Sequence, residues 1–112
     1  MPEAARLNDS IQGATAGEHS GHIPPHGVLP ITGHISDNCS ADVFINSRPA
    51  AYISSITTEY DGCCGSSLGT VAEGSESVFI NGIPAARLGD ALHAHNGAGT
   101  VVSGSSDVFI GG

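Results

Sequence analysis

Three stretches of this 112-residue chain contain most of the side chains that could bind a metal ion. The stretch at about 10–32 has His19, His22 and His26, the stretch at about 56–68 has Cys63 and Cys64, and the stretch at about 91–98 has His93 and His95. Imidazole nitrogen and thiolate sulfur are the ligands that Zn²⁺ favours in tetrahedral sites. If the three stretches meet in space, one ligand set is available, and we predict that it consists of His22, His26, Cys64 and His95.

The spacing supports this set without fixing every member. His22 and His26 are separated by an isoleucine and two prolines, which would hold both rings on a stiff segment. The overall pattern matches no standard zinc-finger spacing, so three alternatives stay open: His19 for His22, Cys63 for Cys64, and His93 for His95. The competing interpretation is that the histidines are solvated and the cysteines are small buried hydrophobic residues.

Four protein ligands would leave no coordination position for water, whereas a catalytic zinc usually keeps one. We therefore predict a structural zinc ion and no catalytic residues. No pair of carboxylates is placed by the sequence as an acid/base couple, and a solvated surface is expected for Glu59, Asp61, Glu73 and Glu76. His34 is expected to be a strand residue that faces solvent.

The elements that must position these stretches are predicted by a sequence motif, here called the phrase, that the chain repeats. The phrase is whole at 77–90 (SVFINGIPAARLGD), nearly whole at 42–51, and split between the two ends, with its second half at 4–9 and its first half at 107–112. Three units of about 4–46, 49–82 and 84–112 result. An internal period of this length indicates a solenoid or a closed array. The split favours closure, because the last strand can supply what the first segment lacks.

Each unit is predicted to be a β-hairpin. Alternating segments at 33–36, 69–72 and 99–102 precede the Val-Phe-Ile segments, with a serine-containing turn between them. Three hairpins around a pseudo-threefold axis could bury Val, Phe and Ile against one another. The predicted fold is thus a single all-β domain shaped as a small cone, closed by both termini and without long helices. One extra residue between Gly33 and Val43 predicts a longer turn or a bulge.

Composition limits the possible partners. A net charge of −8, from 3 arginines against 11 acidic residues, argues against binding nucleic acid or an anionic membrane. No signal-peptide pattern and no membrane-spanning run is visible. Two of the three cysteines are adjacent, so a disulfide framework is not expected. A chain this short buries a modest core, so structural zinc would add useful folding free energy.

The repeated phrase resembles the PAAR-repeat family. Pro84-Ala85-Ala86-Arg87, followed by Leu-Gly-Asp and preceded by Val-Phe-Ile-Asn-Gly, carries the resemblance. Degenerate copies are Pro49-Ala50-Ala51-Tyr52 and Ala4-Ala5-Arg6. The resemblance implies a small cone of β-hairpins, with zinc bound near its vertex by three histidines and one cysteine.

The same resemblance implies a function. Family members cap and sharpen the trimeric valine-glycine-repeat (VgrG-type) spike of the type VI secretion system and related contractile injection machines, such as phage or pyocin tails. The broad base would bind the spike, and the vertex would contact the target membrane transiently during puncture. Effector attachment is a further expected role, and the protein is expected to leave the bacterial cytoplasm on the spike. A small zinc-dependent hydrolase delivered to the target cell is the alternative.

Overall fold

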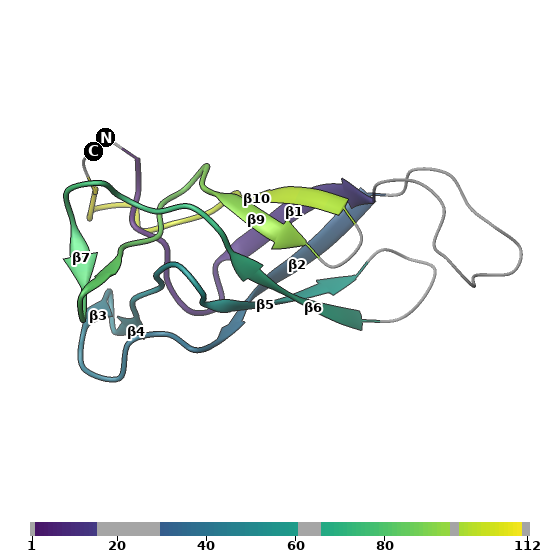
Figure 1. Ribbon diagram of the computed structural model, residues 1–112. Coiled ribbons are helices and arrows are strands. Elements are labelled where there is room, and N and C mark those ends of the chain that lie inside the picture. The colour runs from purple at the N-terminus through teal and green to yellow at the C-terminus, as the bar shows by residue number, and fades with distance from the viewer. Residues whose placement is uncertain (1, 16–29, 61–65, 95–96, 111–112) are drawn as a thin grey trace, which may run out of the picture.

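The computed structural model describes residues 2–15, 30–60, 66–94 and 97–110 (Figure 1). Six strands form a closed antiparallel barrel in the order β1-β10-β9-β6-β5-β2, with β2 pairing back onto β1. Their bounds are β1 Ser10–Thr15, β2 Pro30–Asp37, β5 Ile56–Tyr60, β6 Ser66–Val71, β9 Ala91–Ala94 and β10 Gly97–Val101. The described residues contain no helix, and hence no helix that could cross a membrane. The predicted all-β, closed fold is confirmed.

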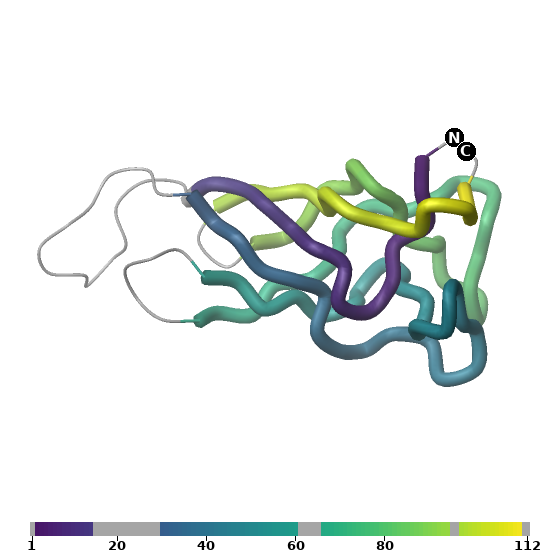
Figure 2. The backbone as a smooth tube through the Cα atoms, turned by 180° about the vertical axis from the view of Figure 1, so that it is seen from behind, coloured from purple at the N-terminus to yellow at the C-terminus, as the bar shows by residue number. Residues whose placement is uncertain are grey.

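Two shorter sheets lie at one end of the barrel, which we call the base (Figure 1). β3 (Phe44–Ile45) pairs with β4 (Arg48–Pro49), and β7 (Phe79–Ile80) pairs with β8 (Ile83–Pro84). The equivalent third pairing joins the two ends of the chain, where Glu3 bridges to Phe109. Figure 2 shows the first and last described segments running side by side at this end. Residues from both termini therefore complete the base.

The hairpin prediction was wrong in its pairing. The strands at 33–36, 69–72 and 99–102 do not pair with the Val-Phe-Ile segments. They belong to β2, β6 and β10, which pair with β1, β5 and β9. These three partner strands occupy the flanks of the stretches that were expected to be loops. β5 carries a strand signal that we missed, because the sequence Ile-Thr-Thr-Glu-Tyr is rich in β-branched and aromatic residues.

A buried serine in each unit explains why the chain leaves the barrel instead of turning back. The side-chain oxygens of Ser40, Ser75 and Ser105 accept hydrogen bonds at 2.9 Å from the backbone N–H three residues later. The serine N–H groups donate at 2.8 Å to backbone carbonyls in the next Ala-Ala segment. Such side-chain bonds stabilise a local turn in competition with a strand ladder. The turn therefore directs each Val-Phe-Ile segment to the base.

Three Ala-Ala segments meet between the base and the barrel. Ala5 N–H donates to Ala86, Ala86 to Ala51, and Ala51 to Ala5, each at 3.0 Å, which closes a ring of three backbone hydrogen bonds. These alanines are fully buried. Three backbones that approach this closely leave room only for small side chains. This geometry accounts for the repeated Ala-Ala of the sequence.

Two apolar clusters lie on either side of this ring. The barrel cluster contains Ile11, Ile35, Val71, Leu92 and Val101 with one alanine from each unit. The base cluster contains Ile45, Ile80 and Ile110 with the other alanine from each unit. The expectation that the Val and Phe of each Val-Phe-Ile segment also enter the core was wrong. Neighbouring residues in a strand point to opposite faces, so burial of each Ile leaves the preceding Phe outside.

Glycines set the width of the barrel. A Cβ atom on Gly13 would lie 2.1 Å from the Ala98 carbonyl oxygen, and one on Gly33 would lie 1.9 Å from the Thr58 carbonyl oxygen. Only glycine permits strands to approach this closely. The bulge predicted in the first unit is also present, as a register shift in the β2–β5 pairing between Ile35 and Asp37.

Candidate functional site

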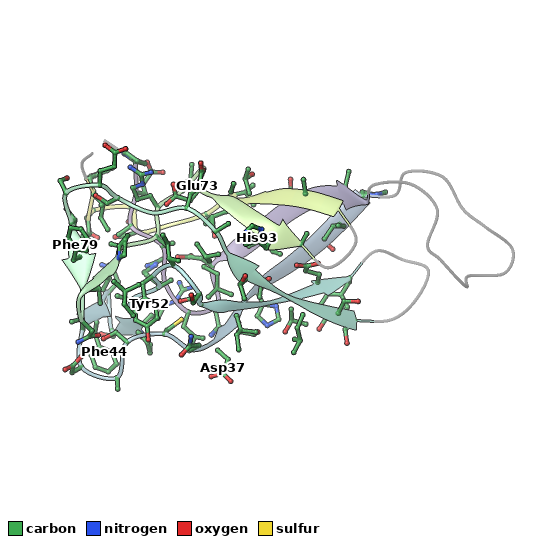
Figure 3. The ribbon with its side chains drawn as sticks, in the orientation of Figure 1. Asp37, Phe44, Tyr52, Glu73, Phe79 and His93 are labelled. Atoms are coloured by element: carbon green, nitrogen blue, oxygen red, sulfur yellow. The ribbon has the colours of Figure 1, made fainter. Side chains whose placement is uncertain are left out.

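The base presents an apolar patch that is repeated three times. It consists of one Val-Phe pair from each unit, and we call it the base patch: Val43, Phe44, Val78, Phe79, Val108 and Phe109. The three Phe residues are 49–56% exposed. Figure 3 shows Phe44 and Phe79 at the base, far from the other end of the barrel. Repetition of large exposed apolar side chains at one end is typical of an interaction surface.

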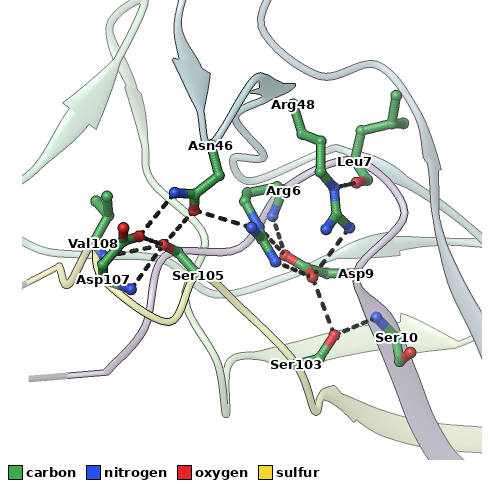
Figure 4. A network of polar contacts seen from close by, with 10 residues as sticks. All are labelled: Arg6, Leu7, Asp9, Ser10, Asn46, Arg48, Ser103, Ser105, Asp107 and Val108. Atoms are coloured by element: carbon green, nitrogen blue, oxygen red, sulfur yellow. Dashed lines mark hydrogen bonds and ion pairs between the residues drawn. The ribbon is translucent and has the colours of Figure 1, made fainter.

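Polar side chains tie neighbouring units together beside this patch. One such set of contacts is centred on Asn46, and we call it the Asn46 joint (Figure 4). The amide oxygen of Asn46 accepts hydrogen bonds from Ser105 and from Arg6 (3.0 Å), and its Nδ2 donates to Asp107 at 2.8 Å. Asn46 has φ +53°, a left-handed conformation that asparagine tolerates better than most residues. The turn residue therefore also crosslinks two units.

The Asn81 joint repeats this arrangement, but the third joint does not. Asn81 accepts from Ser40 at 2.6 Å and donates to Asp42 at 2.8 Å. In the third position, which we call the Ser77 joint, Ser77 replaces the aspartate and lies 3.4 Å, oxygen to oxygen, from Ser75. The repeat aligns Gly111 with the two asparagines, and Gly111 lies outside the described residues. The sequence thus lacks both the amide and the carboxylate at this joint.

The joints also set the charge state of their carboxylates. Hydrogen bonds from Asn81 and then Ser40 lower the pKa of Asp42 below its usual value. Those from Asn46 and Ser105 lower the pKa of Asp107 in the same way. Donors that favour the ionised form have this effect. Both side chains are therefore firmly anionic at neutral pH, and both are exposed at the base.

Behind the Asn46 joint, Asp9 is the centre of an ionic cluster (Figure 4). Its carboxylate is 2% exposed and accepts hydrogen bonds from three groups of Arg6, the backbone N–H (2.7 Å), Nε (2.9 Å) and Nη2 (2.9 Å). Arg48 Nη2 lies 3.2 Å away, and Ser103 donates at 3.1 Å. The bond to Asp9 raises the pKa of Arg6. Two arginines therefore share one buried carboxylate.

The equivalent positions in the other units carry less charge. Arg87 pairs with Asp90 at 2.7 Å without a second arginine. In the remaining unit, the Tyr52 N–H donates to the Ser55 side chain at 3.0 Å, so the turn is kept without an ion pair. Each of the three arginines of the chain is thus bonded to Asp9 or Asp90.

The end opposite the base brings the three long hairpins together. At this end Thr15 pairs with Gly97, Gly97 with Ala94, and Tyr60 with Ser66. The connecting segments 16–29, 61–65 and 95–96 lie outside the described residues. They hold all four predicted zinc ligands, His22, His26, Cys64 and His95, and the alternatives His19 and Cys63. The metal prediction therefore stays a prediction.

Two histidines can be placed. His93 is exposed on β9, next to the buried Leu92. His34 lies in β2, as expected of a strand residue, but it is half-buried and does not face solvent freely. Among the described residues, no three His, Cys, Asp or Glu side chains form a group that could hold a metal.

Glu59 corrects one expectation. It was expected on the surface, but it is only 3% exposed inside the barrel, where its carboxylate accepts from the Thr57 hydroxyl at 3.2 Å. The alternation of β5 contained the signal, since Thr57 and Glu59 share the inner face between the more exposed Ile56, Thr58 and Tyr60. Glu73 and Glu76 are exposed as expected, and Asp61 lies outside the described residues.

These features define a closed β-barrel whose base is built from three related segments and carries three related apolar pairs. A family model for the PAAR motif matches residues 61–112. The match confirms, over these residues, the resemblance found in the sequence. A comparison with curated proteins gave no significant match. The PAAR-motif family is associated with spike tips of type VI secretion systems, and its role is structural and not typically enzymatic.

Proposed function

We propose that this protein caps the end of a trimeric spike in a type VI secretion system or a related contractile injection machine. The observation that carries the proposal is the base patch, in which three units present the same exposed Val-Phe pair. A monomer with three related segments can offer each subunit of a threefold trimer a similar surface. Burial of three Phe side chains would supply much of the binding free energy, because large aromatic residues dominate interface energetics.

The partner in this proposal is a valine-glycine-repeat spike trimer, and the test removes the base patch. The triple variant Phe44→Ser, Phe79→Ser and Phe109→Ser should keep the fold, because these side chains are about half exposed and belong to neither apolar cluster, and it should lose binding to the trimer. Leu68→Ser is the matched control, because Leu68 is 63% exposed on the side of the barrel. Unchanged affinity of the triple variant in a pull-down or by calorimetry would contradict the proposal.

The barrel itself supports a role as a stiff, narrow tip. Six closed strands leave no unpaired barrel edge, and the glycines bring neighbouring strands into close contact. A tip that is driven through a membrane by a contracting sheath must resist deformation. The proposed puncture role rests on this stiffness, and carriage of effectors would use the same particle.

We further propose a structural Zn²⁺ ion at the end opposite the base, held by His22, His26, Cys64 and His95. The support is that the three hairpins end together there and that their connections carry four histidines and two cysteines, from which a set of three imidazoles and one thiolate suited to zinc can be drawn. The ion would crosslink the three connections and add folding free energy.

Metal analysis of the purified protein tests this second proposal. We expect one zinc ion per chain, and loss of zinc with a lower unfolding temperature in His26→Asn and Cys64→Ser. His34→Asn is the control, because His34 lies in β2 and away from the connecting segments. A zinc-free wild-type protein, or full zinc content in both variants, would contradict the assignment.

A further inference from the structure

The three arginines of this protein are all paired with its own carboxylates. Arg6 and Arg48 pair with Asp9, and Arg87 pairs with Asp90. The chain has no lysine and no other arginine, so its 11 acidic residues outnumber its three arginines and the net charge is −8. A partner that approaches the outer surface therefore meets carboxylates and no unpaired guanidinium group.

Some of these carboxylates lie next to the base patch. Each serine turn that leads to a Val-Phe pair carries one exposed acidic side chain: Asp42, Glu76 or Asp107. We call these three residues the acidic rim. Asp42 and Asp107 are held by Asn81 and Asn46 from neighbouring units, which fixes where they point. Asp42 and Asp107 occupy the same position of the repeat, and Figure 4 shows Asp107 beside Val108. Glu76 lies one residue earlier in its turn, so each Val-Phe pair has one exposed acidic residue close by in the sequence.

From this pairing of an apolar centre with an acidic rim we infer that the spike surface that binds the base presents an apolar end surrounded by one lysine or arginine from each subunit. This inference rests on the proposed docking function and adds the chemistry of the partner. Complementary charges at the edge of an interface steer association and fix orientation more than they add affinity. The Phe residues would then provide affinity, and the acidic rim would increase the association rate and orient the two proteins.

The same observation disfavours two other occupants. A second copy of this chain, docked base to base, would place one acidic rim against another. An anionic membrane surface would be repelled for the same reason, because like charges in close contact destabilise a complex. The inference therefore commits to a cationic protein partner of threefold symmetry.

The test measures association rates between this protein and its spike trimer at several salt concentrations. Neutralising the acidic rim with Asp42→Asn, Glu76→Gln and Asp107→Asn should slow association about 10-fold at low salt and flatten its salt dependence. Asn and Gln keep an oxygen acceptor, so the bonds to Ser40, Ser105 and the asparagines can persist. Asp37→Asn is the matched control, because Asp37 is exposed on β2 away from the base (Figure 3), and it should change the rate less than about 2-fold.

Glu76 gives a second, independent test, because it is next to Ser77 in the sequence, whereas Asp42 and Asp107 are hydrogen-bonded to asparagines. Glu76→Lys should slow association more than Glu76→Gln, whereas a purely structural effect would not follow the sign of the charge. Circular dichroism and thermal unfolding establish that each variant is folded.

The outcomes separate the inference from the function on which it rests. Normal rates and salt dependence in the neutralised variant, with binding lost in the triple Phe variant, would overturn the cationic partner and leave docking intact. Unchanged binding of the triple Phe variant would overturn docking itself. Self-association through the base in sedimentation experiments, or Phe-dependent binding to phospholipid vesicles, would overturn the choice of partner.

Discussion

The Asn46 joint and the Ser77 joint occupy related places in the base but are held differently. Their backbone hydrogen bonds are equivalent: the N–H groups of Ser105 and Ser75 each donate at 2.8 Å to the Ala-Ala segment of the next unit. Their side chains do not agree. The Asn46 joint connects to the Asp9 cluster, whereas the Ser77 joint pairs two hydroxyls. Backbone hydrogen bonds therefore maintain the threefold shape, while side-chain networks determine how strongly each joint is held.

The largest expected effect comes from the centre of the stronger joint. Asp9→Asn should lower the free energy of unfolding by about 3–5 kcal/mol, because it leaves the buried Arg6 without its counter-ion. Asp90→Asn should cost less, because Arg87 is more exposed than Arg6 and no second arginine depends on Asp90. Urea unfolding of both variants measures the difference. Equal losses would show that the additional contacts of Asp9 contribute nothing.

A smaller effect is expected from the asparagines. Asn46→Gly should destabilise the protein by about 1–2 kcal/mol, since it removes hydrogen bonds to Arg6 and Ser105. Glycine accepts the positive φ of this position, so the loss reports the side chain and not backbone strain. Asn81→Gly is the matched control and should cost less, because Asn81 contacts no arginine in the described structure. A larger loss for Asn81→Gly would reverse the ranking of the joints.

The Ser77 joint, whose sequence has neither the amide nor the carboxylate of the other two joints, offers a test by substitution. The double variant Ser77→Asp and Gly111→Asn restores the residue types of the other two joints. It should raise the free energy of unfolding by about 0.5–1 kcal/mol, the net value of a typical hydrogen bond. Each single variant should gain little, so a double-mutant cycle should show positive coupling. A destabilised double variant would indicate that the Ser77 joint has its own geometry.

The smallest effect concerns acid. Because the folded-state pKa values of Asp42 and Asp107 are lowered, their contribution to stability is present above the unfolded pKa of about 3.9 and is lost as the pH falls through the folded value. The unfolding temperature should therefore decrease when the pH is lowered below about 4. The drop should be shallower in the Asn46→Gly, Asn81→Gly variant. Identical acid profiles would assign the dependence to other carboxylates.

Much of the fold could be predicted from repetition. The split phrase predicted closure by both termini, and Glu3 meets Phe109 as that requires. Strand pairing could not be predicted in the same way, because the buried serines redirect the chain and this depends on contacts with a distant Ala-Ala segment. The location of Phe outside the core follows from strand alternation, which the Val-Phe-Ile segments already show in the sequence.

The candidate site, like the fold, could be predicted from the sequence only in part. Metal-binding chemistry was visible in residue types, because histidine and cysteine are few and concentrated. The joints were not visible, since Asn46, Ser105 and Asp107 are far apart along the chain and resemble ordinary turn residues. The departures at Ser77 and Gly111 acquire meaning only when the structure of the Asn46 and Asn81 joints is known.

The ring formed by Ala5, Ala51 and Ala86 has a consequence for how this chain reaches its native state. In a linear repeat array each unit contacts only its neighbours, so folding can nucleate anywhere and spread. Here the ring exists only when all three segments have met, and it joins residues near the start of the chain to residues far along it. The three segments must lose loop-closure entropy before the hydrogen bonds of the ring can form and stabilise the fold, so folding should be slow and highly cooperative. The chain would then acquire its structure as a whole and late, after most of it has been synthesised.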